Sequence, residues 1–273
     1  MKNVLLLLMT VIISLSASSV NDKIDYLANV KELVVLTQKM RGNTNVYLKG
    51  GYITLSTISE DRDEVAASLR SLHHNFKIVG FKVDDEFATL NLYMQSLNDV
   101  AADLNTMTTF QAYSLLIKEM ISIGEKVQVD FFMDELELDQ RVSSIMMKNI
   151  LPLTEQLGKL RGFGAGAAVC RECAEDERYY LQEYIDTALE DLRTFVLEMK
   201  SLAGDFPELY SDDIDAHLNL YQSRVRDYLQ LVELKLMDGN DRKIDTYDFF
   251  SQGTSLIDQT LKYYDMNEII LRD

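Results

Sequence analysis

The sequence predicts an all-α protein of eight helices, arranged as two four-helix bundles that arose by internal duplication. A helical hydrophobic period of 3.6 residues runs along almost the whole chain, and no alternating run of strand length competes with it. Proline occurs only at Pro152 and Pro207, and residues that favour helix dominate the composition. An Arg-Gly step also occurs in the first helix of each half, which indicates the duplication.

The first four helices follow from this period and from their boundary residues. The first ends at Gly50, since glycine commonly follows the last turn of a helix. The second begins at Ser59, which is the expected N-cap before an acidic first turn. The four predicted ranges are about 23–49, 59–79, 84–104 and 108–134.

The second half repeats this order. Its first helix begins near Asp139, and we expect a kink or a break at Pro152, because proline lacks the N–H group and clashes with the preceding turn. The next helix stops before Gly204 and Pro207. The last three helices are predicted over about 176–203, 212–237 and 246–271. The two halves are then about 20–138 and 139–273 of one domain, 20–273.

The charge balance is strongly acidic. The chain has 44 Asp and Glu against 27 Lys and Arg, a net charge of −17. Nucleic acid and anionic membrane surfaces prefer basic faces, so we expect no nucleic-acid partner. Any anion site must be built locally, because the overall field repels anions.

Residues 1–19 have the pattern of a secretory signal peptide. Lys2 supplies the positive start, residues 4–15 are mostly apolar, and small residues at 16–19 suit cleavage. The apolar run is short for a membrane span, which needs about 20 residues. We therefore expect a periplasmic or secreted protein, with an uncleaved N-terminal anchor as the alternative.

The two cysteines, Cys170 and Cys173, are spaced Cys-x-x-Cys. In an oxidising compartment this favours a disulfide, and two free thiols are the alternative. No second cysteine pair or histidine cluster accompanies them, so we expect no metal and no cofactor.

The two Arg-Gly steps, Arg41-Gly42 and Arg161-Gly162, are the candidate site. Arginine is a permanent cation with a planar fork of donors, which matches a small planar oxyanion. Glycine beside it lets a helix or a ligand approach the backbone closely. A single step would favour a structural role, with arginine paired to a carboxylate; two steps in matching positions favour an anion site.

Further polar groups of the first helix lie within a turn of Arg41. Gln38 and Thr44 are neutral, so they can add hydrogen bonds to an anion without adding charge. The chain shows no phosphate-binding glycine loop and no nucleophile motif, so we expect a protein that is not an enzyme.

Four segments, 36–48, 113–121, 153–168 and 247–258, resemble the nitrate- and nitrite-sensing domain of bacterial receptors and antiterminators. They are similar to its Gln-x-x-Arg-Gly, Tyr-x-x-Leu-Ile, Glu-x-x-Gly-x-x-Arg-Gly and aromatic…Thr-x-x-Ile-Asp stretches. The resemblance implies two four-helix bundles that bind nitrate or nitrite through arginines, here Arg41 and Arg161. Family members usually carry a signalling output, and this sequence ends with its eighth helix. The expected partner is therefore a membrane-bound receptor or kinase, and a homodimer is reasonable.

The sequence thus predicts an exported sensor that binds a small oxyanion between two arginines and signals by helix rearrangement. Two alternatives remain. One is a helical interaction module without a ligand, in which both arginines form salt bridges and no cavity separates them. The other is a helical sensor of a different small, carboxylate-like ligand.

Overall fold

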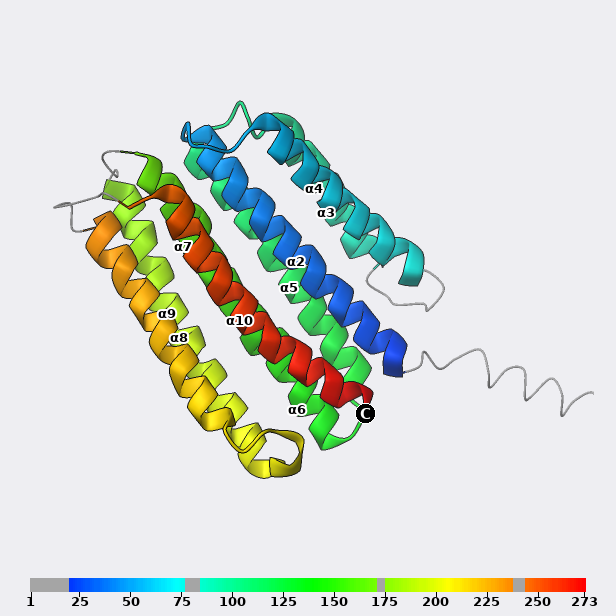
Figure 1. The fold of residues 1–273 in the computed structure, drawn as a ribbon. Coiled ribbons are helices and arrows are strands. Elements are labelled where there is room, and N and C mark those ends of the chain that lie inside the picture. The colour runs from blue at the N-terminus through cyan, green and yellow to red at the C-terminus, as the bar shows by residue number, and fades with distance from the viewer. Residues whose placement is uncertain (1–19, 77–83, 171–174, 238–243) are drawn as a thin grey trace, which may run out of the picture.

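The computed structural model describes residues 20–76, 84–170, 175–237 and 244–273, and these ranges contain helices and no strands (Figure 1). This confirms the predicted all-α class. The helices are α2 (Val20–Leu48), α3 (Leu55–Phe76), α4 (Asp84–Val100), α5 (Thr106–Phe132), α6 (Glu137–Ile145), α7 (Leu151–Val169), α8 (Glu175–Asp205), α9 (Ile214–Val232) and α10 (Thr246–Arg272). Because α6 and α7 form one continuous helix, the described part of the chain has the expected eight.

The helices lie in four pairs side by side, in the order α3 with α4, α2 with α5, α7 with α10, and α8 with α9 (Figure 1). In the first half α2 packs on α3 and α5, and in the second half α7 packs on α8 and α10. The two halves meet where α2 packs on α7. This arrangement is consistent with two four-helix bundles, and it puts the helices that carry the Arg-Gly steps in the middle.

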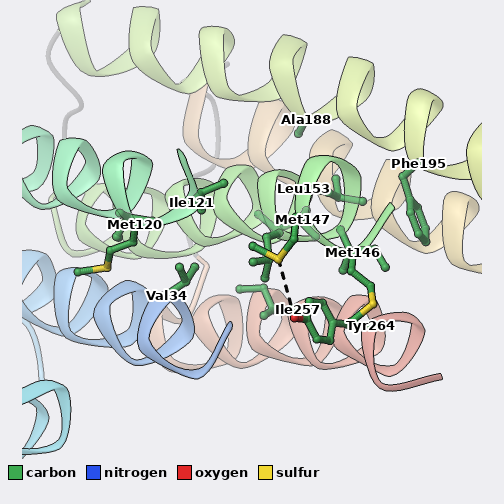
Figure 2. Packing of buried hydrophobic residues seen from close by; sticks show 14 of the residues in the cluster. Val34, Met120, Ile121, Met146, Met147, Leu153, Ala188, Phe195, Ile257 and Tyr264 are labelled. Atoms are coloured by element: carbon green, nitrogen blue, oxygen red, sulfur yellow. Dashed lines mark hydrogen bonds between the residues drawn. The ribbon is translucent and has the colours of Figure 1, made fainter. Parts of the chain in front are cut away.

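One apolar core runs through both halves (Figure 2). Val34 on α2, Met120 on α5 and Leu153 on α7 are fully buried members of it. Tyr264 on α10 is buried there too, and its hydroxyl lies 3.9 Å from the sulfur of Met147. Since buried side chains of the two halves contact one another, the halves form a common interior. No helix in the described ranges has both the length and the apolarity that a membrane span requires.

The fourth helix of each half begins in the same way. α5 and α10 are both 27 residues long and start 140 positions apart. The side chain of Asn105 caps α5 by accepting from the N–H of Thr108 at 2.8 Å. The side chain of Asp245 caps α10 by accepting from the N–H of Asp248 at 2.9 Å. This shared start supports the internal duplication.

The two caps give a first prediction. Asn105→Ala and Asp245→Ala should each lower the free energy of unfolding by about 1 kcal/mol, because each leaves an N-terminal N–H group without its acceptor. Urea denaturation of each variant measures this. Asp245→Asn keeps the acceptor and should cost much less than Asp245→Ala. If only one of the two alanine variants lost stability, the caps of α5 and α10 would not be equivalent.

The helix is irregular near Pro152, as expected, but it does not break there. The helix widens into a π-helical turn at Met146–Ile150 and then continues as α7 with Pro152 in its first turn. Proline has no N–H to donate and crowds the preceding carbonyls, and a wider turn just before it accommodates both effects. The sequence located the irregularity, and the structure has a widened turn there in place of a break.

The start of α3 also differs from the prediction. The helix begins at Leu55, and the hydroxyl of Thr54 accepts from the N–H of Thr57 at 3.3 Å, so Ser59 is not the N-cap. Asp61, expected in an acidic first turn, is buried and accepts from Asn43 at 2.7 Å. A buried carboxylate needs such a partner, and this one ties α3 to α2.

Candidate anion site at the central helix crossing

The glycines of the two Arg-Gly steps meet where α2 crosses α7. A Cβ atom placed on Gly162 would lie 2.8 Å from the Cα of Gly42, and one placed on Gly42 would lie 3.3 Å from the Cα of Gly162. The side-chain amide of Asn45 donates to the carbonyl of Gly162 at 2.9 Å. The absence of two side chains therefore lets the backbones touch and brings the neighbouring arginines to the same part of the protein.

Arg41 is fully buried, and its charge is balanced within the protein. Its two terminal nitrogens pair with the two oxygens of Glu155, with a distance of 3.1 Å between Nη2 and Oε2. Nη1 also donates to the hydroxyl of Ser114 at 2.8 Å. The guanidinium carbon lies 4.8 Å from the centre of the Phe110 ring, which adds a cation–π contact.

Arg161 is also buried, with 5% of its surface exposed, but its partners are neutral. Nη1 donates to the hydroxyl of Thr254 at 3.1 Å, and the guanidinium lies 4.7 Å from the centre of the Phe250 ring. In the described part of the chain it forms no ion pair with a carboxylate. Burial lowers the pKa of Arg161 to about 10, and the positive charge of Arg41 acts in the same direction.

The two arginines have matching partners on the fourth helices. Phe110 and Ser114 on α5 correspond to Phe250 and Thr254 on α10, again 140 positions apart. Each hydroxyl donates to the carbonyl of the phenylalanine one turn before it, at 2.8 and 3.0 Å. Each arginine therefore lies against a phenylalanine and donates to a hydroxyl from its own half of the chain.

These four partner residues were not among those predicted from the sequence. The signal was present: an aromatic residue is followed four positions later by a hydroxyl residue, five positions after the N-cap in both helices. Aligning the fourth helices, as well as the first, would have found it.

The two arginines differ in whether a carboxylate from the other half of the chain pairs with them. Glu155 precedes Arg161 by six positions, and the residue six positions before Arg41 is Val35. The second half thus supplies a carboxylate to the arginine of the first half, and the first half supplies none in return. This difference leaves one neutralised and one unneutralised arginine at the crossing.

Several buried polar atoms without a hydrogen-bond partner among the described residues lie at or beside the arginines, and others, such as Ser68 Oγ and Gln128 Oε1, lie elsewhere. Those at or beside the arginines include the Nε atoms of Arg41 and Arg161 and both amide atoms of Gln38. Gln38 lies beside Arg41, because a Cβ on Gly158 would be 3.2 Å from the Gln38 amide and 3.3 Å from Arg41 Nη2. Buried polar groups in native proteins are nearly always satisfied by protein, water or a ligand, so these atoms mark a polar region that water or a polar ligand can fill.

Tyr228 on α9 is the neutral group beside Arg161. A Cβ on Gly253 would lie 2.7 Å from its hydroxyl oxygen and 2.8 Å from Arg161 Cβ. The hydroxyl is buried and has no hydrogen-bond partner among the described residues. Burial raises the pKa of Tyr228, which keeps the hydroxyl protonated and able to donate. Tyr228 was not among the residues predicted from the sequence.

A groove between α5, α7 and α8 leads to this region. It has a volume of about 470 Å³, and its lining includes Ser114 and Glu155, the two hydrogen-bond partners of Arg41. Lys159 stands at its mouth, with its amino group 4.0 Å from Glu155 and 5.3 Å from the centre of the Tyr184 ring. The groove connects solvent with the partners of the buried arginine.

The remaining predicted residues lie as follows. Thr44 is buried on α2, and its hydroxyl has no hydrogen-bond partner in the described ranges, so no contact joins it to either guanidinium. Cys170 follows the last residue of α7. Cys173 and the predicted signal peptide, residues 1–19, lie outside the described residues. The disulfide and the cleavage therefore stay predictions.

No family model matches this sequence, and no curated protein matches it. A solved structure of the NasR transcription antiterminator has the same fold, with a TM-score of 0.67 at 14% sequence identity. The alignment covers 91% of this chain and 67% of that chain. At this identity the likeness shows the shared all-α architecture.

This likeness corrects the expectation that nucleic acid plays no part. A protein of the same fold is a transcription antiterminator, a regulator whose function is tied to nucleic acid. The expectation rested on the net charge of −17. Net charge is a sum over the whole surface, so it does not determine local patches or what a further part of a longer chain contacts.

Proposed function

We propose that this chain is a regulatory sensor that binds a small planar oxyanion, nitrate or nitrite, at the crossing of α2 and α7. The observation that carries the proposal is Arg161: a buried cation without a carboxylate partner in the described part of the chain, next to unsatisfied polar groups. A buried charge is costly unless it is paired, and a bound anion would pair with it.

The donors beside the two arginines suit such a ligand. The Nε of Arg161 is available, and hydrogen bonds to charged groups contribute about 1.5–3 kcal/mol each. The amide of Gln38 and the hydroxyl of Tyr228 are neutral donors on either side of the arginine pair. Nitrate and nitrite present only acceptor oxygens in a plane, which matches a set made of donors.

The same geometry supports signalling by helix rearrangement. Gln38 lies on α2, Arg161 on α7 and Tyr228 on α9, so a shared ligand would link three helices from both halves. A ligand shifts a conformational equilibrium only when it binds one state better than the other. An anion shared by these donors would favour the state in which α2 and α7 are in close contact at their crossing.

The resemblance of four segments to nitrate- and nitrite-sensing domains supports the choice of ligand, since Arg41 and Arg161 match the arginines of that family's motifs. The shared fold with a transcription antiterminator supports a regulatory rather than a catalytic role. The pattern of residues 1–19 supports an exported form of this sensor.

One observation favours the alternative of an interaction module without a ligand. Arg41 forms a buried ion pair with Glu155, as that alternative predicts for both arginines. It does not account for Arg161, which has no such pair in the described ranges, nor for the unsatisfied amide of Gln38. The sensor proposal accounts for both.

Isothermal titration of the purified chain with sodium nitrate and sodium nitrite, in a buffer without chloride, tests the proposal. We expect a dissociation constant of about 1 mM or tighter, and a loss of at least about tenfold for Arg161→Met and for Gln38→Leu. Arg141→Met is the matched control, because Arg141 forms an exposed ion pair with Asp205 away from the crossing. Absence of binding by the folded wild type, or an equal loss in the control, would overturn the proposal.

A further inference from the structure

We propose that Glu155 determines the charge of the ligand, so that the site accepts monoanions and rejects dianions such as sulfate. This inference rests on the proposed function, because it describes the selectivity of that same anion site. Glu155 forms an ion pair with Arg41, so only the positive charge of Arg161 is left for the ligand to balance.

The charges at the crossing support this role. Arg41, Arg161 and Glu155 are all buried, and together they carry one net positive charge. A bound monoanion makes the assembly neutral, whereas a dianion leaves a buried negative charge without a partner. Burying an uncompensated charge is strongly unfavourable, so the ligand's charge is selected as well as its shape.

The hydrogen bonds of Arg41 act in the same direction. Both of its terminal nitrogens donate to Glu155, and one also donates to Ser114. Only Nε remains without a partner in the described part of the chain. The fork that would hold two oxygens of a sulfate is therefore occupied by a carboxylate of the protein itself.

Lys159 does not change this count of buried charges. Its amino group lies 4.0 Å from Glu155, but it stands at the mouth of the groove with 21% of its side chain exposed. Burial lowers the pKa of Lys159, and the negative charges of Glu155, Glu183 and Asp191 oppose that change. Two of these carboxylates lie outside the crossing, so they and the solvent at the groove mouth balance part of its charge.

The internal duplication supplies a position for a reciprocal test. Val35 on α2 corresponds to Glu155 on α7, and it lines a groove between α2 and α10 with a volume of about 430 Å³. This groove matches the one that contains Glu155. Leu36 corresponds to Gln156 on the first helices, and Leu261 and Asp265 correspond to Ile121 and Glu125 on the fourth helices. A glutamate at position 35 would therefore approach Arg161 as Glu155 approaches Arg41.

Three variants test the inference by titration with sodium nitrate and sodium sulfate at equal ionic strength and neutral pH, with circular dichroism to monitor the fold. Glu155→Gln keeps the shape of the side chain and removes its negative charge, which raises the net charge of the crossing by one. The affinity for sulfate relative to nitrate should therefore rise at least about tenfold. Val35→Glu neutralises Arg161, so the affinity for nitrate should fall at least about tenfold. The double variant restores one net positive charge and should regain the preference for nitrate.

Glu135→Gln is the matched control, because it removes a carboxylate from a distant ion pair with Lys23 and should leave the ratio unchanged. If the wild type binds no anion, the proposed function fails. If the wild type binds nitrate but folded Glu155→Gln keeps the wild-type ratio of nitrate to sulfate affinity, only the role of Glu155 is overturned. If Glu155→Gln does not fold, undiminished nitrate affinity in Val35→Glu overturns it.

Discussion

Arg41→Met should lower the free energy of unfolding by about 3–5 kcal/mol, whereas Arg161→Met should leave it unchanged or raise it. The two arginines occupy matching positions of a repeat, so this contrast follows from their partners alone. Removing Arg41 leaves the buried carboxylate of Glu155 without the cation that holds both of its oxygens. Breaking one side of a buried ion pair is among the most destabilising single changes.

Arg161 responds differently because its charge has no carboxylate partner in the described ranges. Methionine has an unbranched apolar side chain that fills irregular space, and it removes a buried cation whose pKa is lowered by burial. The free protein loses the hydrogen bond to Thr254 and the contact with Phe250, and relief from burying an unpaired charge offsets that loss. Nitrate should stabilise the wild type by mass action and should not stabilise Arg161→Met.

Urea denaturation of both variants in a buffer without chloride measures the contrast. A double variant, Arg41→Met with Glu155→Leu, removes both charges together and should recover most of the lost stability, because a buried ion pair replaced by apolar residues is often neutral. Equal losses of unfolding free energy in Arg41→Met and Arg161→Met would contradict the inferred difference between the two arginines.

Gly162→Ala should lower the free energy of unfolding by about 1–3 kcal/mol, and Gly162→Leu by more, because both overpack the crossing of α2 and α7. The added Cβ would lie 2.8 Å from the Cα of Gly42 and 3.3 Å from the Phe110 ring. One of these neighbours is backbone, which cannot move without shifting the whole helix. The same shift would separate the two arginines, so nitrate affinity should fall together with stability.

Gly204→Ala is the control for this change. Gly204 lies in α8, and a Cβ there meets no atom within 4 Å. Alanine should raise the stability by about 0.5–1 kcal/mol at such a site, because glycine in a helix loses more conformational freedom on folding. Thermal unfolding of the two Gly→Ala variants compares them directly. A stabilising effect at both positions would mean that the helices are not in close contact at Gly162.

Much of the helical framework could be predicted, because helix signals are local. The starts of α5 and α10 follow from Asn105 and Asp245, which cap their own helices three residues on. The two exceptions have non-local or competing causes. The second helix begins before the predicted first turn, where Thr54 accepts from the N–H of Thr57, and Asp61 instead pairs with Asn43 of another helix. Pro152 is accommodated by a widened turn that sequence periodicity does not distinguish from a break.

Eight amphipathic helices and two Arg-Gly steps in matching positions can be recognised in the sequence, because period, caps and glycines act over a few neighbouring residues. The difference between the two arginines arises from the packing of the helices. The chain has 44 acidic residues, and no local pattern says which of them reaches a given arginine. Arg41 pairs with Glu155, which is 114 positions away in the sequence, and Arg161 pairs with no carboxylate in the described ranges. Both outcomes depend on how distant helices pack against each other. Since buried charges interact over distance in space rather than in sequence, the ligand site is a property of the packed bundle.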